Sequence, residues 1–334
     1  MMKFTWPVAQ FLNPLIDLKK FPLLMLVCVL LASSCKKEQI ELLTQEIDTG
    51  TSLNLYDIFF ANDSIGYACG GDKWTKGVFT RTLDGGKTWS KADSICNVAA
   101  YAIHFFSAGE GIVAGNASDW ATTTDSGRSF ILTNSDYHPI NDIALRDKNT
   151  WVRVGGEGFA DGFISSSDNA GASWKYTHLP NNMTAVQFAD SNTVFASGYG
   201  VIYRSTDAGT NFNPLEVRGD FFIAMDFFSG QLGYFAGYEG SILKTSDGGN
   251  SFQKVRGGNA PFSPRVHFLA IKFWNESVGY AVGENGVMFK TENGGADWKR
   301  VKSFTDVTLR AIHLFSAGSG TVCGDNGRMF LFKQ

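Results

Sequence analysis

The sequence is poor in cysteine, proline and histidine, and it has no hydrophobic run long enough to cross a bilayer. Among 334 residues there are 5 cysteines, 8 prolines and 5 histidines. No two cysteines form a Cys-x-x-Cys pair and the histidines show no ligand spacing, so we predict no metal site. No phosphate loop or dinucleotide fingerprint stands out, so we expect no cofactor. The formal net charge of -3 gives no support to a nucleic-acid partner.

Glycine and aromatic residues, in contrast, are abundant. The chain has 37 glycines and 28 phenylalanines, and 44% of its residues are hydrophobic. This composition suits many short strands that are joined by tight turns around a large core. Period-2 alternation bounded by Gly and Asn recurs along the chain, and no window shows sustained helical spacing. The sequence therefore predicts an all-β fold.

The start of the chain resembles a bacterial lipoprotein signal. Lys19 and Lys20 precede a 14-residue apolar run, residues 21–34, which suits a signal h-region and is too short to span a bilayer. Small residues then lead directly into Cys35. The resemblance implies that residues 1–34 are a signal peptide, that Cys35 is lipidated, and that residues 35–38 are a linker. Ordinary secretory cleavage near Ser34 with a free Cys35 is the alternative.

The residues that follow Cys35 bear on localisation. Lys36 stands in the second position of the expected mature chain, where there is no Asp. By resemblance to lipoproteins, this favours the outer membrane, on its periplasmic or its surface-exposed side. The lipid would then be the only membrane anchor.

A Ser/Thr-x-Asp/Asn-x-Gly-x-x-aromatic turn organises the rest of the chain. The copy at residues 245–252 reads Thr-Ser-Asp-Gly-Gly-Asn-Ser-Phe. A short Asp or Asn side chain accepts hydrogen bonds from nearby backbone amides, and the Gly supplies a positive φ. We therefore interpret these positions as structural, and we expect the aromatic residue to open the next strand and to bury between neighbouring sheets. The six Asp or Asn positions are Asp84, Asp125, Asn169, Asp207, Asp247 and Asn293, at spacings of 41, 44, 38, 40 and 46 residues.

This period is typical of repeated four-stranded units, and the sequence contains seven of them. Their first strands begin near Tyr56, Tyr101, Asn141, Met183, Ile223, Leu269 and Leu309. The last unit stops at Gln334 before a fourth strand, whereas residues 39–47 form a strand-like segment without partners. That segment would supply the missing outer strand and close the ring. We predict a seven-bladed, monomeric β-propeller over residues 39–334, with six blades as the alternative.

The repeats resemble the BNR/Asp-box repeats of sialidases, sortilin-type receptors and photosystem II stability/assembly factor-like proteins. The resemblance to the last family is strongest, because residues 279–298 follow its repeat unit almost throughout. Members of that family are propellers that hold membrane-protein partners during biogenesis. This scaffold also hosts enzymes and receptors, so the repeat predicts the fold better than the function.

In a propeller, the loops between second and third strands gather on one face around the central channel. Here they carry Asp72, Asp119, Glu157, Asp161 and Glu239 among aromatic residues, and exposed aromatics are over-represented at binding centres. Solvated acidic turns with aromatics folded back on their blades are the alternative interpretation. The candidate binding residues on this face are Trp74, Trp120, Phe159, Tyr199, Tyr238, Glu284 and Asp325, with Arg265 and Arg310 near the connections between blades.

A shared position of the first strands is polar in five units although apolar residues flank it. We expect these side chains to line a wet central channel, and a proton-handling or ligand role for the two histidines is the alternative. In the other two units this position holds Phe59 and Ala144. The five residues are His104, Gln187, Asp226, Lys272 and His313.

Cys69 and Cys323 occupy the same place in their repeats, before Gly70 and Gly324. In an oxidising envelope they could form a disulfide, but we favour two buried small side chains.

The sequence contains no arrangement of residues that is typical of a catalytic site. A sialidase-like site needs an arginine cluster and a tyrosine beside an acid; Arg218, Arg265 and Arg310 lie near connections, but no Arg precedes Arg81. We therefore predict a non-enzymatic, lipid-anchored envelope scaffold that binds a protein or glycan. The alternative is a carbohydrate-active hydrolase that uses the acidic face, with Glu284 or Asp325 as its acid.

Overall fold

The computed structural model describes residues 39–91, 93–116, 119–134, 138–259 and 265–334. The expected signal peptide, the linker and Cys35 lie outside these residues. Within them, no helix is long and apolar enough to cross a membrane.

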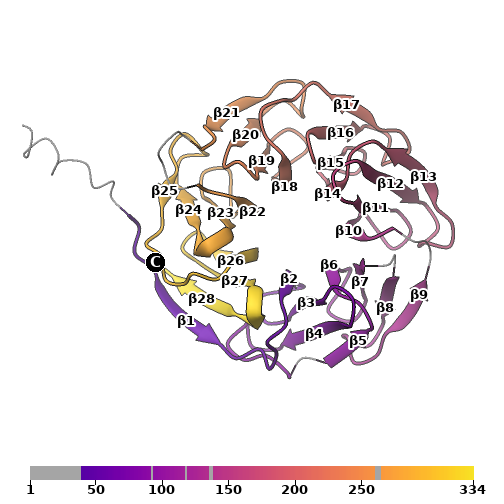
Figure 1. Ribbon diagram of the computed structural model, residues 1–334, viewed down its shortest axis with the longest axis horizontal. Coiled ribbons are helices and arrows are strands. Elements are labelled where there is room, and N and C mark those ends of the chain that lie inside the picture. Colours follow the sequence, from indigo (N-terminus) through magenta and orange to yellow (C-terminus); the bar gives the residue numbers. More distant parts are fainter. Residues whose placement is uncertain (1–38, 92, 117–118, 135–137, 260–264) are drawn as a thin grey trace, which may run out of the picture. The chain divides into compact units, whose positions relative to one another are not determined.

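Seven four-stranded antiparallel sheets are arranged in a ring, with the first strand of each sheet innermost (Figure 1). Blade 1 is β2 (Leu55–Phe60), β3 (Gly66–Asp72), β4 (Lys76–Thr82) and β5 (Asp93–Cys96). Blade 2 is β6 (Ala100–Phe105), β7 (Gly111–Gly115), β8 (Asp119–Thr123) and β9 (Ile131–Asn134). Blade 3 is β10 (Ile140–Leu145), β11 (Trp151–Glu157), β12 (Asp161–Ser167) and β13 (Lys175–Leu179). Blade 4 is β14 (Met183–Phe188), β15 (Val194–Gly198), β16 (Val201–Ser205) and β17 (Asn213–Leu215).

The remaining blades repeat this order. Blade 5 is β18 (Phe222–Phe227), β19 (Gly233–Gly237), β20 (Ile242–Thr245) and β21 (Gln253–Arg256). Blade 6 is β22 (Phe268–Phe273), β23 (Gly279–Gly283), β24 (Met288–Thr291) and β25 (Lys299–Arg300). Blade 7 contains β26 (Leu309–Ser316), β27 (Ser319–Gly324) and β28 (Met329–Lys333). Single 3-10 turns, η2 (Glu284–Gly286) and η3 (Asp325–Gly327), connect the second and third strands of blades 6 and 7.

The N-terminal segment closes the ring. β1 (Leu43–Ile47) pairs antiparallel with β28, from Leu43 opposite Lys333 to Ile47 opposite Met329. Just before it, Ile40 forms a parallel bridge to Val301 of blade 6. The predicted closure and the count of seven blades are therefore confirmed, and the six-blade alternative is wrong.

Neighbouring blades are held together by aromatic stacking at a repeated position. A tyrosine or phenylalanine on the second strand of one blade stacks on the last phenylalanine of the next blade's first strand. Tyr234 lies 3.7 Å from Phe273 between ring centroids, and Phe195 lies 4.2 Å from Phe227. A Cβ atom at Gly279 would lie 2.6 Å from the Phe273 ring, which explains the glycine that begins this second strand. Each pair of neighbouring blades therefore shares a hydrophobic cluster of its own, as between blades 5 and 6 and between blades 4 and 5.

The Asp-type turns form a shared hydrogen-bond pattern. In the first copy, Asp84 Oδ1 accepts from the Thr88 amide at 2.9 Å and Oδ2 accepts from the Thr88 hydroxyl at 2.6 Å. The hydroxyl of Thr82 accepts from the Gly86 amide at 3.0 Å. Because the two bonds from Thr88 stabilise the ionised carboxylate, they lower the pKa of Asp84 to about 2. The aromatic residue that follows, such as Trp89, is half-buried and lies before the outer strand instead of opening it.

Cys69 and Cys323 are both free and buried, as we favoured over a disulfide. Burial raises the pKa of both thiols, so neither is poised to react.

Candidate functional site

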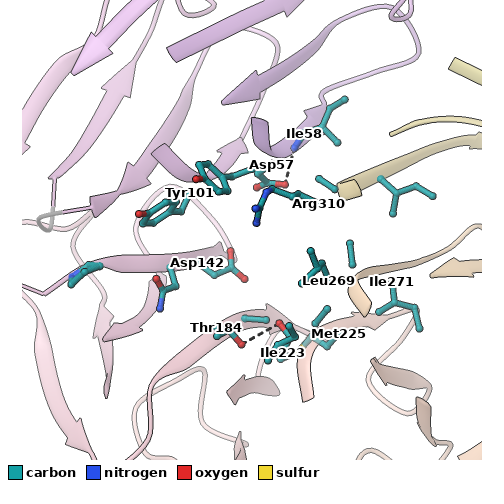
Figure 2. A pocket seen from close by; sticks show the side chains of 18 of the residues that line it. Asp57, Ile58, Tyr101, Asp142, Thr184, Ile223, Met225, Leu269, Ile271 and Arg310 are labelled. Carbon is teal, nitrogen blue, oxygen red and sulfur yellow. Dashed lines mark hydrogen bonds between the residues drawn. The ribbon is translucent and has the colours of Figure 1, made fainter. Parts of the chain in front are cut away.

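The central channel widens into a cavity of about 700 Å³ that reaches the loop face. Its walls are the first strands, and its rim is formed by loops between second and third strands, including Lys73, Glu157 and Gly158. We call it the mouth cavity. Figure 2 shows side chains from several blades directed into it. A cavity of this size is large enough for a small ligand or for one or two side chains of a protein partner.

The second residue of every first strand lines the mouth cavity. Only Arg310 among them was predicted as a site residue, because the bulge that follows the first residue of each of these strands was not predicted. Tyr56 and Tyr101 meet edge to face at 5.0 Å, and the Arg310 guanidinium lies 5.0 Å from the Tyr56 ring centroid. Burial raises the pKa of Tyr101 to about 12. The seven residues are Tyr56, Tyr101, Asn141, Thr184, Ile223, Leu269 and Arg310.

Two aspartates of the mouth cavity were also missed. Asp57 Oδ1 accepts from the Ile58 amide at 2.8 Å and Oδ2 accepts from Ile103 of the next blade at 2.9 Å. Asp142 bridges blades 3 and 4 in the same way, with Val186 at 2.8 Å. Both side chains are half-buried in the channel wall. Burial outweighs these hydrogen bonds and raises the pKa of Asp57 to about 6 and that of Asp142 to about 8.

Part of the expected polar ring joins blades instead of facing water. Asp226 is buried, and Lys272 Nζ donates to its Oδ1 at 2.7 Å. Gln187 accepts from the Phe227 amide at 3.0 Å and donates to the Phe227 carbonyl at 3.3 Å. The interpretation of Asp226 as channel lining is therefore wrong, whereas Gln187 is half-buried and its exposure to the channel stays a prediction. Lys272 and His313 do line the cavity.

The two histidines of this ring pack on aromatic rings. His313 stacks on Phe60 at 4.5 Å, and His104 lies 5.0 Å from Phe59. Burial, helped by the positive charge of Lys272, lowers the pKa of both imidazoles to about 4. They are therefore neutral near pH 7, and this favours a packing role over proton handling.

The loop-face aromatics fall into two groups. Trp74 and Phe159 are exposed, with 65% and 70% of their surface accessible. Trp120 is buried, because it lies within β8 and meets Trp151 of blade 3 at 5.5 Å. The prediction that Trp120 belongs to the binding face is wrong. The side chain of Asp119 lies outside the described part of the structure.

Three aromatic rings from blades 3, 4 and 5 form a continuous series on the rim. Phe159 meets Tyr199 at 4.9 Å and Tyr199 meets Phe221 at 5.6 Å, both edge to face. Phe221, which was not predicted as a site residue, is 40% exposed. We call these three residues the rim ladder.

The charged candidates pair with one another. The Tyr238 hydroxyl donates to Glu284 Oε1 at 2.9 Å, and its ring lies 4.4 Å from that of His267. Arg310 Nε donates to Asp325 Oδ1, which joins two predicted residues of blade 7. Arg265 is exposed and lies 3.9 Å from Glu239. The acidic face is thus partly neutralised by its own arginines.

The structure does not assemble the arginine cluster of a sialidase. Arg218, Arg265 and Arg310 each face a different carboxylate, at Glu216, Glu239 and Asp325. The pair of Tyr238 and Glu284 has the residue types of a tyrosine nucleophile and its base. However, burial and the negative charge of Glu284 raise the pKa of Tyr238, which disfavours a phenolate. Among the described residues, no group of three or more His, Cys, Asp or Glu side chains could hold a metal ion.

Comparison with known proteins agrees with this architecture. The family model of the photosynthesis system II assembly factor YCF48 matches residues 212–308. The structure of YCF48 bound to D1 peptide superposes with a TM-score of 0.70 at 17% identity, over 90% of this chain and 100% of that one. The chain is a seven-bladed β-propeller of the BNR type, similar to the YCF48 assembly factors.

Other propellers share the fold. YCF48 from Cyanidioschyzon merolae has a TM-score of 0.67 at 17% identity, over 87% of this chain and 98% of that chain. The WD40 β-propeller domain of Doa1 has a TM-score of 0.65 at 11% identity, over 87% and 95% of the two chains. At such low identity these structures establish the fold alone. No curated protein matches the sequence.

Proposed function

We propose that this protein is a non-enzymatic, lipid-anchored scaffold of the cell envelope that binds a protein partner on its loop face. The observation that carries the proposal is the rim ladder beside the mouth cavity, since Phe159 and Phe221 are 70% and 40% exposed next to an open channel. Neighbouring exposed aromatics of this kind mark interaction sites, whereas single ones are ordinary. A rigid ring presents them in a fixed arrangement, which lowers the entropy lost on binding.

The similarity to the YCF48 propellers supports a protein partner. One of those proteins has been solved with a bound D1 peptide. Propellers of this kind therefore bind protein segments, and we extend that mode of action to this chain. A glycan is the second class of partner that the aromatic rim could accept.

The anchor is the second half of the proposal. It rests on the signal-like segment before Cys35, which would tether the propeller to the outer membrane on its periplasmic or surface side. Metabolic labelling with a palmitate analogue tests it: the wild-type protein incorporates the label, and Cys35→Ala does not. An unlabelled wild-type protein would remove the lipid anchor from the account.

Crosslinking in the native envelope followed by mass spectrometry tests the partner. We expect one dominant protein, which is lost from the Phe159→Ala/Phe221→Ala double variant. Trp274→Ala is the matched control, because Trp274 is 45% exposed and follows β22 on the opposite face. Equal loss from both variants, or no specific protein at all, would contradict the proposal.

The hydrolase alternative keeps one supporting observation, the hydrogen bond between Tyr238 and Glu284. A screen of fluorogenic sialosides and other glycosides tests it directly. We expect no turnover above that of a Tyr238→Phe/Glu284→Gln variant. Turnover that depends on these two residues would replace the scaffold account with an enzyme.

A further inference from the structure

The backbone around the rim ladder connects it to the wall of the mouth cavity. The Asn182 amide donates to the Phe159 carbonyl at 3.3 Å, and the Tyr199 amide donates to the Asn182 carbonyl at 3.0 Å. Asn182 and Gly158 themselves line the cavity, as does Ile223, two residues after Phe221. A chain that lies along the ladder is therefore within side-chain reach of the cavity.

The cavity beside the ladder contains two carboxyl groups that no lysine or arginine of the described residues approaches within ion-pair distance, although the positive charge of Lys272 acts on Asp57. Asp57 and Asp142 reach into it from β2 and β10 (Figure 2). Across the part of the chain that the structure describes, neither residue forms an ion pair with a lysine or an arginine. The two cations of the wall are already engaged, Arg310 by Asp325 and Lys272 by Asp226. At the rim, Glu157 is 63% exposed and lies 3.8 Å from Lys73.

These charged side chains determine which kind of ligand group fits the mouth cavity. An anionic group would meet Asp57, Asp142 and Glu157, and each cation that could receive it is already paired with a carboxylate: Lys73, Lys272 and Arg310. A cationic group would gain the carboxyl groups of Asp57 and Asp142 as partners inside a partly desolvated cavity, where ion pairs are stronger than in open water. Its positive charge would also favour ionisation of Asp142, whose pKa of about 8 keeps it largely protonated near pH 7 when no cation is bound. The exposed rings beside the cavity require an apolar group on the same ligand.

We propose that the rim ladder and the mouth cavity together bind an extended segment of a protein partner, with an apolar side chain on Phe159, Tyr199 and Phe221. A lysine or arginine of the same segment enters the cavity and faces Asp142 and Asp57. The inference rests on the proposed function and names the part of the partner that the loop face recognises.

A selection from a phage-displayed library of random 12-residue peptides on the full-length protein tests this inference. We expect enrichment of sequences in which an aromatic or leucine residue lies within a few positions of a lysine or arginine. A synthetic peptide from the selection then gives affinities by fluorescence polarisation. Enrichment of acidic peptides, or of peptides without a cation, would overturn the inference.

Changing the peptide tests the cation without touching the fold. We expect acetylation of the peptide lysine, or replacement of its arginine by citrulline, to weaken binding about tenfold or more, because a charged partner is lost. On the protein, Asp142→Asn should produce a similar loss, and Phe159→Ala/Phe221→Ala a further one. The Trp274→Ala control should bind as the wild type does.

The outcomes separate the inference from the function that it rests on. Peptides that need the rim ladder but tolerate lysine acetylation would remove the cation pocket and leave the scaffold intact. Peptides that are insensitive to Phe159→Ala/Phe221→Ala would contradict both. Binding of saccharides in place of peptides, with the same dependence on the ladder, would make the partner a glycan and overturn the inference.

Discussion

The Lys272 ammonium group lies 2.7 Å from Asp226 Oδ1, so a residue of blade 6 is paired with one of blade 5 at the channel wall. The second oxygen of Asp226 accepts from the Phe273 amide at 2.7 Å. The Asp226 carboxylate raises the pKa of Lys272 above its ordinary range. The pair therefore joins two blades by one charged and one backbone contact.

Because the Asp226 side chain is only 5% exposed, we expect Asp226→Ala to lower the free energy of unfolding by about 2 to 4 kcal/mol. Lys272→Met should lose little stability from the lysine itself, since the Lys272 side chain is 42% exposed. However, it leaves the buried Asp226 carboxylate without its cation. Urea unfolding of both single variants and of the double variant measures the coupling. A double variant whose loss equals the sum of the single losses would show that the pair is not coupled.

The six Asp-type turns obey a pairing rule that the sequence pattern does not state. Where the third position is Asp, the residue four positions later donates, as Ser251 does to Asp247 at 2.6 Å. Where it is Asn, that residue accepts: Asn293 Nδ2 donates to Asp297 Oδ2 at 3.1 Å. We expect Asn293→Asp to destabilise the protein by about 1 to 2 kcal/mol, because two carboxylates then face each other.

Adding Asp297→Ser to Asn293→Asp should restore stability, since the turn then matches that of Asp247 and Ser251. Asp297→Ser alone should cost little, because Asn169 already pairs with Ser173 at 2.8 Å. Thermal melts of the three variants decide the matter. Equal stability of Asn293→Asp with and without the second change would refute the rule.

The half-buried histidines His104 and His313 predict acid sensitivity. The native pKa of His104 and His313 is about 4, below the ordinary value of 6.5, so the unfolded chain binds protons more readily than the native one. Their contribution to stability is complete above pH 6.5 and is lost progressively as the pH falls towards 4. We expect His104→Phe to reduce the fall in Tm between pH 7 and pH 5, and Phe59 already occupies the equivalent place in blade 1. An unchanged fall would show that His104 is not responsible.

Closure by β1 predicts how the N-terminus tolerates truncation. A chain that starts at Gln39 retains all pairing between β1 and β28 and should melt as the full-length protein does. A chain that starts at Thr49 loses β1 and the buried Ile47, and we expect its Tm to fall by on the order of 10 °C. Differential scanning calorimetry of the two chains measures the difference. Identical melting temperatures would mean that the last blade is stable with three strands.

The ring and its closure could be predicted because they repeat. Each Asp-type turn marks one unit. The last unit ends at Gln334 without a fourth strand, and the strand-like segment at residues 39–47, which belongs to no unit of its own, supplies it. The same repetition explains why Cys69 and Cys323 could be interpreted as equivalent buried positions.

The site could not be predicted in the same way, because its residues are the exceptions to the repeat. The third position of the first strands is Ala in five blades and Asp only at Asp57 and Asp142, so alternation alone assigns it no exposure to the channel. The backbone bulge that directs these positions into the mouth cavity depends on contacts between strands. Trp120 was misplaced because the third strand of blade 2 already begins at Asp119, so Trp120 lies within this strand and not in the loop before it.

Site-specific photo-crosslinking in the native envelope tests the central claim most directly. A photoreactive residue is placed at Tyr199 or Phe221 on the rim ladder, and at Trp274 on the opposite face as the control. The account predicts one discrete protein adduct from the two ladder positions and none from Trp274. Adducts of equal yield from both faces, or no protein adduct from the ladder, would contradict a loop face that binds a protein partner.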